Sequence, residues 1–203
     1  MRALPPTYFR RQDETSDEIF YQIPRKVVHI DDTAILLLKA YYGVVLPRDA
    51  VLLDMMSSWR SHYPDDLRPV RVYAQGMNAE EMADNPQIDE FIVHNLNAHP
   101  SLPYEDNMFD AVTCAVSVQY LTQPVTVFTD VRRILRRGGI FVVSFSNRCF
   151  PTKAIAAWLN MSDMQHIALV TGYFEMAGFT DLNTEIHRGG SSDPLFIVTG
   201  RKS

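Results

Sequence analysis

The chain has 203 residues, enough for one domain with a hydrophobic core, or for one domain and an arm. Its hydrophobic fraction of 46% and charged fraction of 21% are ordinary for a soluble globular protein, and its formal net charge of −5 argues against broad binding to nucleic acids or anionic membranes. Two cysteines, no apolar stretch long enough to span a bilayer and no apolar signal core at the N-terminus indicate a reducing intracellular compartment such as the cytoplasm.

An N-terminal arm is expected over residues 1–30, followed by a single domain over residues 31–203. The arm is polar and carries several acidic residues, so we expect it to be exposed. Tyr21, Arg25 and His29 lie near its end. These side chains either close over a substrate or anchor the arm to the domain surface, and the sequence leaves both interpretations open.

Apolar runs and helical patterns alternate along most of the remaining chain. The expected strands are 51–54, 70–74, 91–94, 110–116, 140–146, 182–187 and 195–199. The expected helices are one from an N-cap at Asp31 or Asp32 to a stop at Gly43, a short one from Ser58, one from Glu80, and three more over 124–135, 152–159 and 163–177. This alternation up to the fifth strand predicts an α/β fold, with a parallel sheet covered by helices on both faces.

The segment VLLDMMSSWRSH, residues 51–62, is the most informative stretch of the chain. It predicts a buried strand that ends in Asp54, then a tight turn at Ser57 and Ser58 that enters a helix. In open α/β sheets, ligands bind at the carboxyl ends of the strands. The glycine-rich loop of nucleotide-type sites is absent, so the sequence leaves open whether the turn binds a cofactor through its hydroxyls and backbone N–H groups or binds nothing.

Two later segments carry the pattern of a known family. LPYEDNMFDAVTC begins at Leu102, and VFTDVRRILRRGGIFVVSF begins at Val127. Together they have a Leu-Pro loop, a Phe-Asp entry to the fourth strand and an Arg-x-Leu-x-x-Gly-Gly turn into the fifth. In this order and spacing, residues 51–199 resemble the class I S-adenosylmethionine-dependent methyltransferases, specifically the type 11 methyltransferase group. The resemblance implies a Rossmann-like seven-stranded sheet of order 3-2-1-4-5-7-6, with the last strand antiparallel, and S-adenosylmethionine as the cofactor.

The resemblance also implies where the cofactor lies. The loop after the first strand holds its methionine part, the ends of the second and third strands hold the ribose and adenine, and the end of the fourth strand forms the wall behind the sulfonium. Asn78 stands where the family usually has a carboxylate that binds the ribose. An amide at this position lacks the charge-assisted hydrogen bond that a carboxylate makes. The implied cofactor-binding residues are Asp54, Met55, Met56, Ser57, Ser58, Met77, Asn78, Asn95, Leu96, Asn97, Ala115, Val116 and Ser117.

The acceptor is expected over the carboxyl ends of the fourth and fifth strands, as in the resembled family. The loop 144–153 leaves the fifth strand there, and its polar side chains either orient a polar or anionic acceptor or belong to a structural loop in which Arg148 forms a surface ion pair. The candidate acceptor-binding residues are Tyr21, Arg25, His29, Tyr120, Asn147, Arg148 and Cys149.

Methyl transfer from a sulfonium is an in-line displacement, for which the protein mainly supplies alignment and a dry pocket. We therefore assign no catalytic residue, and the six histidines show no metal-binding pattern. VSVQY follows the fourth strand in place of the amide-methylation motif Asn/Asp-Pro-Pro-Tyr/Phe, which favours a small-molecule acceptor over DNA or protein amides. The alternatives are a methyltransferase-like binding or regulatory protein without catalysis and a dinucleotide-dependent enzyme, against which the absent G-x-G-x-x-G loop counts.

Overall fold

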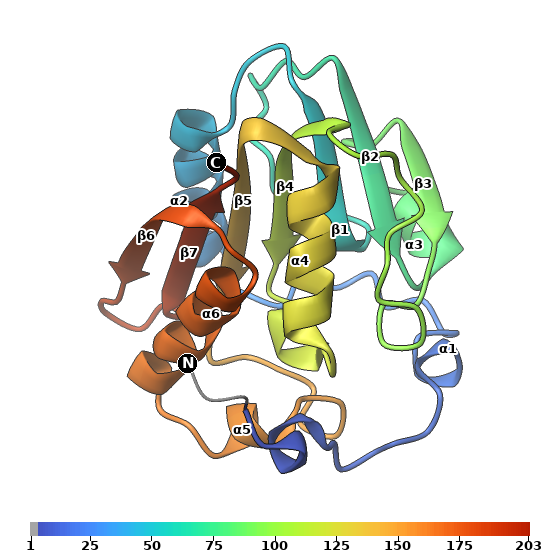
Figure 1. The fold of residues 1–203 in the computed structure, drawn as a ribbon, viewed down its shortest axis with the longest axis vertical. Helices are drawn as coiled ribbons and strands as arrows, with labels where there is room; N and C mark the ends of the chain where they lie inside the picture. The colour runs from blue at the N-terminus through green and yellow to red at the C-terminus, as the bar shows by residue number, and fades with distance from the viewer. Residues whose placement is uncertain (1–3) are drawn as a thin grey trace.

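The computed structural model describes residues 4–203 and is built on a seven-stranded sheet of order β3-β2-β1-β4-β5-β7-β6 (Figure 1). The strands are β1 (Val51–Ser57), β2 (Arg71–Gly76), β3 (Glu90–Val93), β4 (Phe109–Ala115), β5 (Leu135–Phe145), β6 (Thr180–His187) and β7 (Leu195–Arg201). Strands β1 to β5 pair in parallel, and β7 is antiparallel to both β5 and β6. The predicted strand order and the antiparallel last strand are confirmed.

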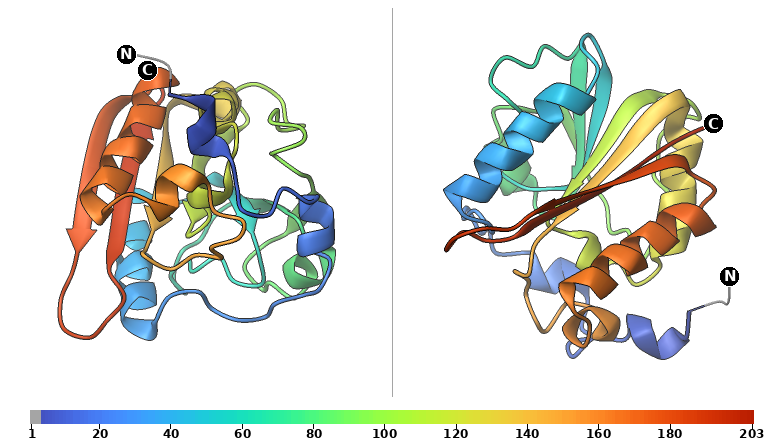
Figure 2. Two further views of the ribbon diagram at one scale, coloured as in Figure 1. Left: turned by 90° about the horizontal axis from the view of Figure 1, so that it is seen from below. Right: turned by 90° about the vertical axis from the view of Figure 1, so that its left-hand side faces the viewer.

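Helices cover both faces of the sheet (Figure 2). They are η1 (Pro6–Phe9), α1 (Asp17–Phe20), α2 (Asp32–Val45), α3 (Ala79–Ala83), η2 (Val118–Tyr120), α4 (Pro124–Ile134), α5 (Ala156–Leu159) and α6 (Asp163–Met176). Because side chains alternate along a strand, Leu52 packs in one core with α2 and Leu53 in the other with α4 and α6. The sheet is therefore buried on both faces, which explains the near-continuous apolar runs of its central strands.

Helix α2 begins where predicted and ends later. Its N-cap is Asp31, whose carboxylate accepts a hydrogen bond from the Ala34 N–H at 2.9 Å. The helix passes through Gly43 and ends at Val45, because the Leu46 N–H still bonds to the Tyr42 carbonyl. Gly43 as a stop was therefore wrong. A glycine is compatible with the helical conformation, so it ends a helix only where the chain turns left-handed.

The short helix predicted from Ser58 does not form, and residues 58–70 connect β1 to β2 as irregular chain. Tertiary contacts replace the helical hydrogen bonds. Asn85 donates to the Ser58 carbonyl at 3.0 Å and to the Ser61 hydroxyl at 2.9 Å, while the buried Tyr63 hydroxyl pairs with Thr113 at 2.8 Å. As a consequence, no helix N-terminus follows β1.

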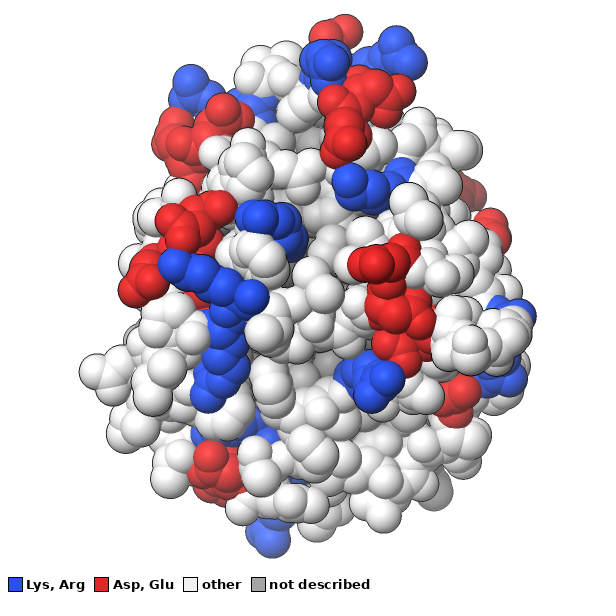
Figure 3. Space-filling view, turned by 180° about the vertical axis from the view of Figure 1, so that it is seen from behind, with Lys and Arg blue, Asp and Glu red and all other residues white. Residues whose placement is uncertain are grey.

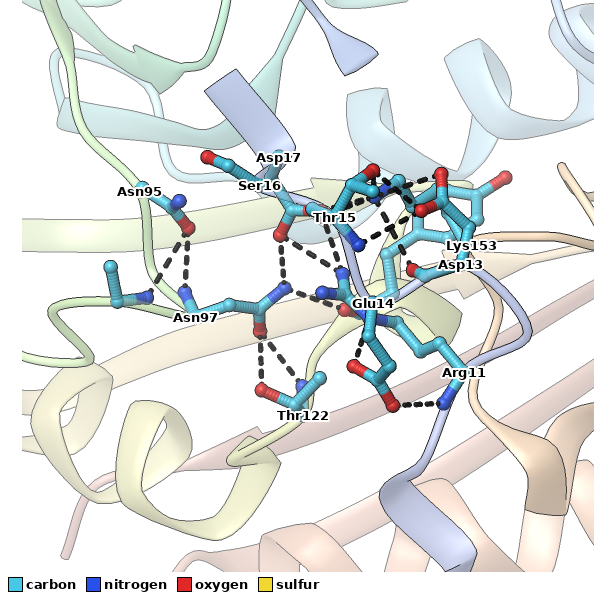
Figure 4. A network of polar contacts seen from close by, with 12 residues as sticks. Arg11, Asp13, Glu14, Thr15, Ser16, Asp17, Asn95, Asn97, Thr122 and Lys153 are labelled. Carbon is cyan, nitrogen blue, oxygen red and sulfur yellow. Dashed lines mark hydrogen bonds and ion pairs between the residues drawn. The ribbon is translucent and has the colours of Figure 1, made fainter. Parts of the chain in front are cut away.

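The arm crosses the carboxyl ends of the parallel strands (Figure 1). A polar network holds it there (Figure 4), centred on the fully buried Lys153, which donates to the Thr15 carbonyl at 2.6 Å. The same ammonium lies 3.2 Å from Asp13 and 3.4 Å from Asp17, and Asp17 also pairs with Arg11 at 2.7 Å. Residues 11–17 of the arm are thus anchored to the domain at this edge, while most of the described arm residues remain exposed, as expected from the sequence.

Charged side chains of both signs are interspersed on the face seen in Figure 3. Several of the surface ion pairs link elements far apart in the sequence, such as Lys26 with Asp84 and Arg71 with Glu90. Exposed pairs of this kind contribute less than about 1 kcal/mol each, so the fold depends mainly on the two apolar cores.

Candidate functional site

A pocket lies between the arm and the carboxyl ends of the central strands. It encloses about 1180 Å³ of empty space, its open mouth included. Twelve of the thirteen predicted cofactor-binding residues line it, namely Asp54, Met56, Ser57, Ser58, Met77, Asn78, Asn95, Leu96, Asn97, Ala115, Val116 and Ser117. The exception is Met55, which points into the core with α4 and α6 and is fully buried. Alternation along β1 explains this difference.

Asp54 is a buried carboxylate on the pocket wall. The Ser57 hydroxyl donates to it at 2.6 Å, and the Thr113 hydroxyl lies 3.4 Å away. Burial raises the pKa of Asp54 from 3.8 to about 6, and these hydroxyl groups oppose the shift. At pH 7 the pocket therefore contains a poorly solvated negative charge at the end of β1.

The glycine-free loop adopts the backbone conformation for which glycine is usually needed. Met56 has φ of 57°, and Val116, which follows the neighbouring strand β4, has φ of 51°. Both lie in the left-handed region, which costs roughly 1–2 kcal/mol for a residue with a Cβ. The Met56 N–H donates to the Gln75 side chain at 3.0 Å, which supports the turn. Strain of this kind is typical of residues that shape a site.

The end of β2 has no acidic side chain. The strand ends at Gly76, and a Cβ there would lie 2.4 Å from the Ser57 carbonyl oxygen. Asn78, two residues later, caps α3 through its Oδ1 atom, which accepts from the Glu81 N–H at 3.0 Å. Its Nδ2 atom donates to the Tyr21 carbonyl at 2.9 Å. Asn78 therefore lines the pocket, but its polar atoms hold the helix and the arm.

Asn95 and Asn97 make a second attachment for the arm (Figure 4). Asn97 donates to Asp17 at 2.8 Å and accepts from the Thr122 N–H at 2.8 Å, while Asn95 donates to Glu18 at 2.6 Å. These amide groups are satisfied by protein partners. The buried Leu96 between them contributes an apolar wall to the pocket.

Comparison with known proteins identifies the fold. A family model described as a methyltransferase domain matches residues 70–143. A S-adenosylmethionine-dependent methyltransferase from Aquifex aeolicus superposes with a TM-score of 0.59 at 13% identity, covering 99% of this chain and 100% of that one. The chain has the class I methyltransferase fold. The resemblance inferred from the sequence is thus confirmed.

Other proteins that are similar to this chain differ from one another in activity. The [4+2]-cyclase SpnF has a TM-score of 0.62 at 18% identity, covering 83% of this chain and 81% of that one. Haemonchus contortus phosphoethanolamine N-methyltransferase 2, in complex with S-adenosylmethionine, has a TM-score of 0.60 at 12% identity. The match covers 84% of this chain and 52% of that one. The biotin biosynthesis bifunctional protein BioHC of Teredinibacter turnerae is 28% identical over 96 residues, which are 46% of this chain and 17% of that protein.

The acceptor candidates predicted from the sequence divide into two groups. Tyr21, Arg25, His29 and Tyr120 line the pocket, whereas Asn147, Arg148 and Cys149 do not. Arg148 is 64% exposed and pairs with Asp193 at 2.8 Å, as the structural interpretation of this loop predicted. Burial raises the pKa of the half-buried Cys149 thiol. These three side chains therefore lie outside the pocket, and their role at the acceptor stays a prediction.

Phe150 is the residue of that loop that reaches the pocket, and the sequence analysis missed it. Its backbone N–H donates to the Tyr120 hydroxyl at 2.8 Å, and the two rings stack with centroids 6.0 Å apart. An apolar residue in a polar loop is the signal that could have identified it.

The irregular segment after β1 supplies further pocket residues that are not predicted from the sequence, where a helix is expected. They include Trp59, Arg60 and His62. Burial, together with the nearby basic groups of Lys39, His29 and Arg60, lowers the pKa of His62 to about 4, so this imidazole is neutral at pH 7. Trp59 donates its ring N–H to the Val27 carbonyl at 3.0 Å and thereby joins the segment to the arm.

Within residues 4–203, no helix combines the length and apolar character needed to cross a membrane. In the same part of the chain, no group of three or more His, Cys, Asp or Glu side chains is arranged to hold a metal ion.

Proposed function

We propose that the protein transfers a methyl group from S-adenosylmethionine to a small-molecule acceptor. The observation that carries this proposal is the pocket at the carboxyl ends of β1, β2 and β4, in the strand order of the methyltransferase fold. In open α/β sheets this is the position at which nucleotide-like ligands bind. The methyltransferase-domain match over residues 70–143 supports the same activity.

The residues present fit this cofactor mainly through apolar and backbone contacts. Met77 and Leu96 supply apolar surface where an adenine would lie, and Asp54 supplies a buried negative charge for a cationic ligand. The usual carboxylate for the ribose has no equivalent at Gly76, since any side chain there would collide with Ser57. When bound, the cofactor supplies a methyl group activated by a sulfonium charge.

The chain's own contribution is alignment, exclusion of water and removal of a proton. The arm covers the pocket and limits access of solvent. Two histidines on the pocket wall, His29 and His62, have pKa values lowered by burial. Each neutral imidazole has a ring nitrogen that can accept a proton from the acceptor, although burial also makes both rings weaker bases. The proposal requires no metal ion.

A second candidate is a methyltransferase-like binding or regulatory protein without catalysis. The observation that favours it is the use of Asn78, Asn95 and Asn97 to hold the arm. The amide groups of these residues already have protein partners and are therefore not free to bind a cofactor. In this alternative, the pocket binds a ligand without catalysis, and the bound ligand stabilises the closed position of the arm.

Isothermal titration with S-adenosylmethionine and S-adenosylhomocysteine tests the proposal. We expect both to bind at micromolar concentrations and Ser117→Phe to abolish binding, since the added ring enters the pocket. Ser101→Phe is the matched control, because Ser101 is exposed and does not line the pocket. Absence of heat for both ligands up to millimolar concentration would contradict the enzyme function. Binding of both without turnover of any acceptor would favour the second candidate.

A further inference from the structure

Arg25 carries a charge in the pocket that the surrounding protein does not neutralise. No carboxylate among residues 4–203 forms an ion pair with it, and its Nη1 atom is buried without a hydrogen-bond partner in that part of the chain. A buried donor left unpaired costs about 1–3 kcal/mol, and more when it is charged. A ligand with an acceptor group would remove this cost.

Glu81, the carboxylate that contacts the backbone of Arg25, already has two hydrogen-bond partners. Its Oε1 atom accepts from the backbone N–H of Arg25 at 2.6 Å, and its Oε2 atom accepts from the Ser58 hydroxyl at 2.6 Å. Glu81 therefore fixes the backbone of the arm, while the guanidinium of Arg25 extends elsewhere.

Aromatic rings hold that guanidinium in place. Its central carbon lies 4.4 Å from the ring centroid of Phe20 and 5.6 Å from that of Phe150. Cation–π contacts stabilise the charge through the ring faces and leave the in-plane N–H groups free for a ligand. Tyr120 stacks on Phe150, and His29 meets the same ring edge-on at 5.2 Å. The surroundings therefore suit a flat ligand with an anionic end.

The other cations near the pocket already have partners. Arg60 donates to the Trp59 carbonyl at 2.7 Å and lies over the Trp59 ring, with 3.8 Å to its centroid. Arg11 and Lys153 both pair with Asp17. Of the two arginines among residues 4–203 that line this pocket, Arg25 is the one with a buried N–H group that lacks a hydrogen-bond partner.

We propose that the acceptor is a small aromatic carboxylate, whose anionic end binds the guanidinium of Arg25 and whose ring packs against Phe150 and Tyr120. Planar guanidinium groups bind carboxylates through two parallel hydrogen bonds, which a single arginine with free N–H groups can supply. This inference rests on the proposed function, of which it names the substrate class. The cofactor's own amino-acid carboxylate offers the same chemistry, and the experiment separates the two sources.

The test compares benzoate with its neutral isostere benzamide, by titration of the protein with and without saturating S-adenosylhomocysteine. We expect the wild type to bind benzoate at least tenfold more tightly than benzamide and Arg25→Gln to lose this preference. Arg48→Gln is the matched control, since Arg48 is exposed before β1 and outside the pocket. Arg25→Lys keeps the charge but not the planar fork, so we expect an intermediate preference.

Equal affinity of the wild type for benzoate and benzamide would overturn the inference. It would also be overturned if Arg25→Gln left the preference intact. A third overturning result is weakened binding of S-adenosylhomocysteine to Arg25→Gln with unchanged binding of 5′-methylthioadenosine, because Arg25 would then hold the cofactor's carboxylate. Failure of S-adenosylhomocysteine to bind, together with an Arg25-dependent preference for benzoate in the protein alone, would refute the proposed function and leave the carboxylate site standing.

Discussion

Replacing Asp54 by Asn should stabilise the protein at neutral pH, although Asp54 lines the pocket. Burial raises the pKa of Asp54 from 3.8 to about 6, so the ionised form is disfavoured in the folded state by about two pKa units. At roughly 1.4 kcal/mol per unit, this corresponds to about 3 kcal/mol at pH 7. The folded state binds the proton more tightly than the unfolded state, so wild-type stability falls as pH rises from 3.8 to about 6. Asp54→Asn removes that loss.

Urea denaturation of wild type and Asp54→Asn between pH 4 and pH 8 measures this effect. The difference in free energy of unfolding should be near zero at pH 4 and should grow to between about 1 and 3 kcal/mol in favour of the variant above pH 6, with the lower value if the amide N–H₂ finds no acceptor. Asp66→Asn, at an exposed carboxylate, is the control and should show no such growth. A difference that is independent of pH, or that favours the wild type at pH 7.5, would refute the reasoning.

Three further substitutions test the arm, the strand ends and the acceptor loop. Lys153→Met should destabilise the protein by about 3 kcal/mol and speed proteolytic cleavage in the arm, because Asp17 loses one of its two cationic partners and keeps Arg11. Unchanged cleavage would contradict the role of Lys153 as an anchor. Gly76→Ala should lower the free energy of unfolding by about 1–3 kcal/mol in urea, since its Cβ would lie 2.4 Å from a carbonyl oxygen. Arg148→Ala should leave the affinity for S-adenosylhomocysteine unchanged and lower the free energy of unfolding by less than about 1 kcal/mol. A loss of affinity would show that Arg148 contributes to ligand binding.

The sheet could be predicted from the sequence because its signals are local and repeated. Apolar runs mark each central strand, and the motifs around Phe109 and Gly139 identify the fourth and fifth strands in order. The family resemblance then supplied the order of all seven. Strand ends follow the hydrophobic pattern to within a few residues, except that β5 begins at Leu135, directly after α4.

The parts that the sequence did not predict depend on partners far away in the chain. Ser58 is a favourable cap residue, but its carbonyl bonds to Asn85 and its hydroxyl to Glu81, so no helix starts there. Asn78 has the chemistry of a ribose ligand, but the backbone places it at the start of α3, beneath the arm. Local patterns do not contain these long-range contacts.

The pocket, too, could be predicted from the sequence only in part. The residues that follow each strand could be located from the sequence, since the carboxyl ends of parallel strands meet at one edge of a sheet. Whether the arm contributes to the pocket could not be decided from the sequence, because Tyr21, Arg25 and His29 are compatible both with binding a substrate and with packing the arm onto the domain. In the structure they line the pocket, where Arg25 is left without an anion among residues 4–203.

A crystal structure of the protein with S-adenosylhomocysteine tests the central claim most directly. We predict electron density for the ligand in the pocket beneath the arm, with its adenine between Met77 and Leu96 and its homocysteine part near Asp54. An empty pocket in crystals grown at millimolar ligand concentration, or a ligand bound away from the ends of β1, β2 and β4, would contradict the account.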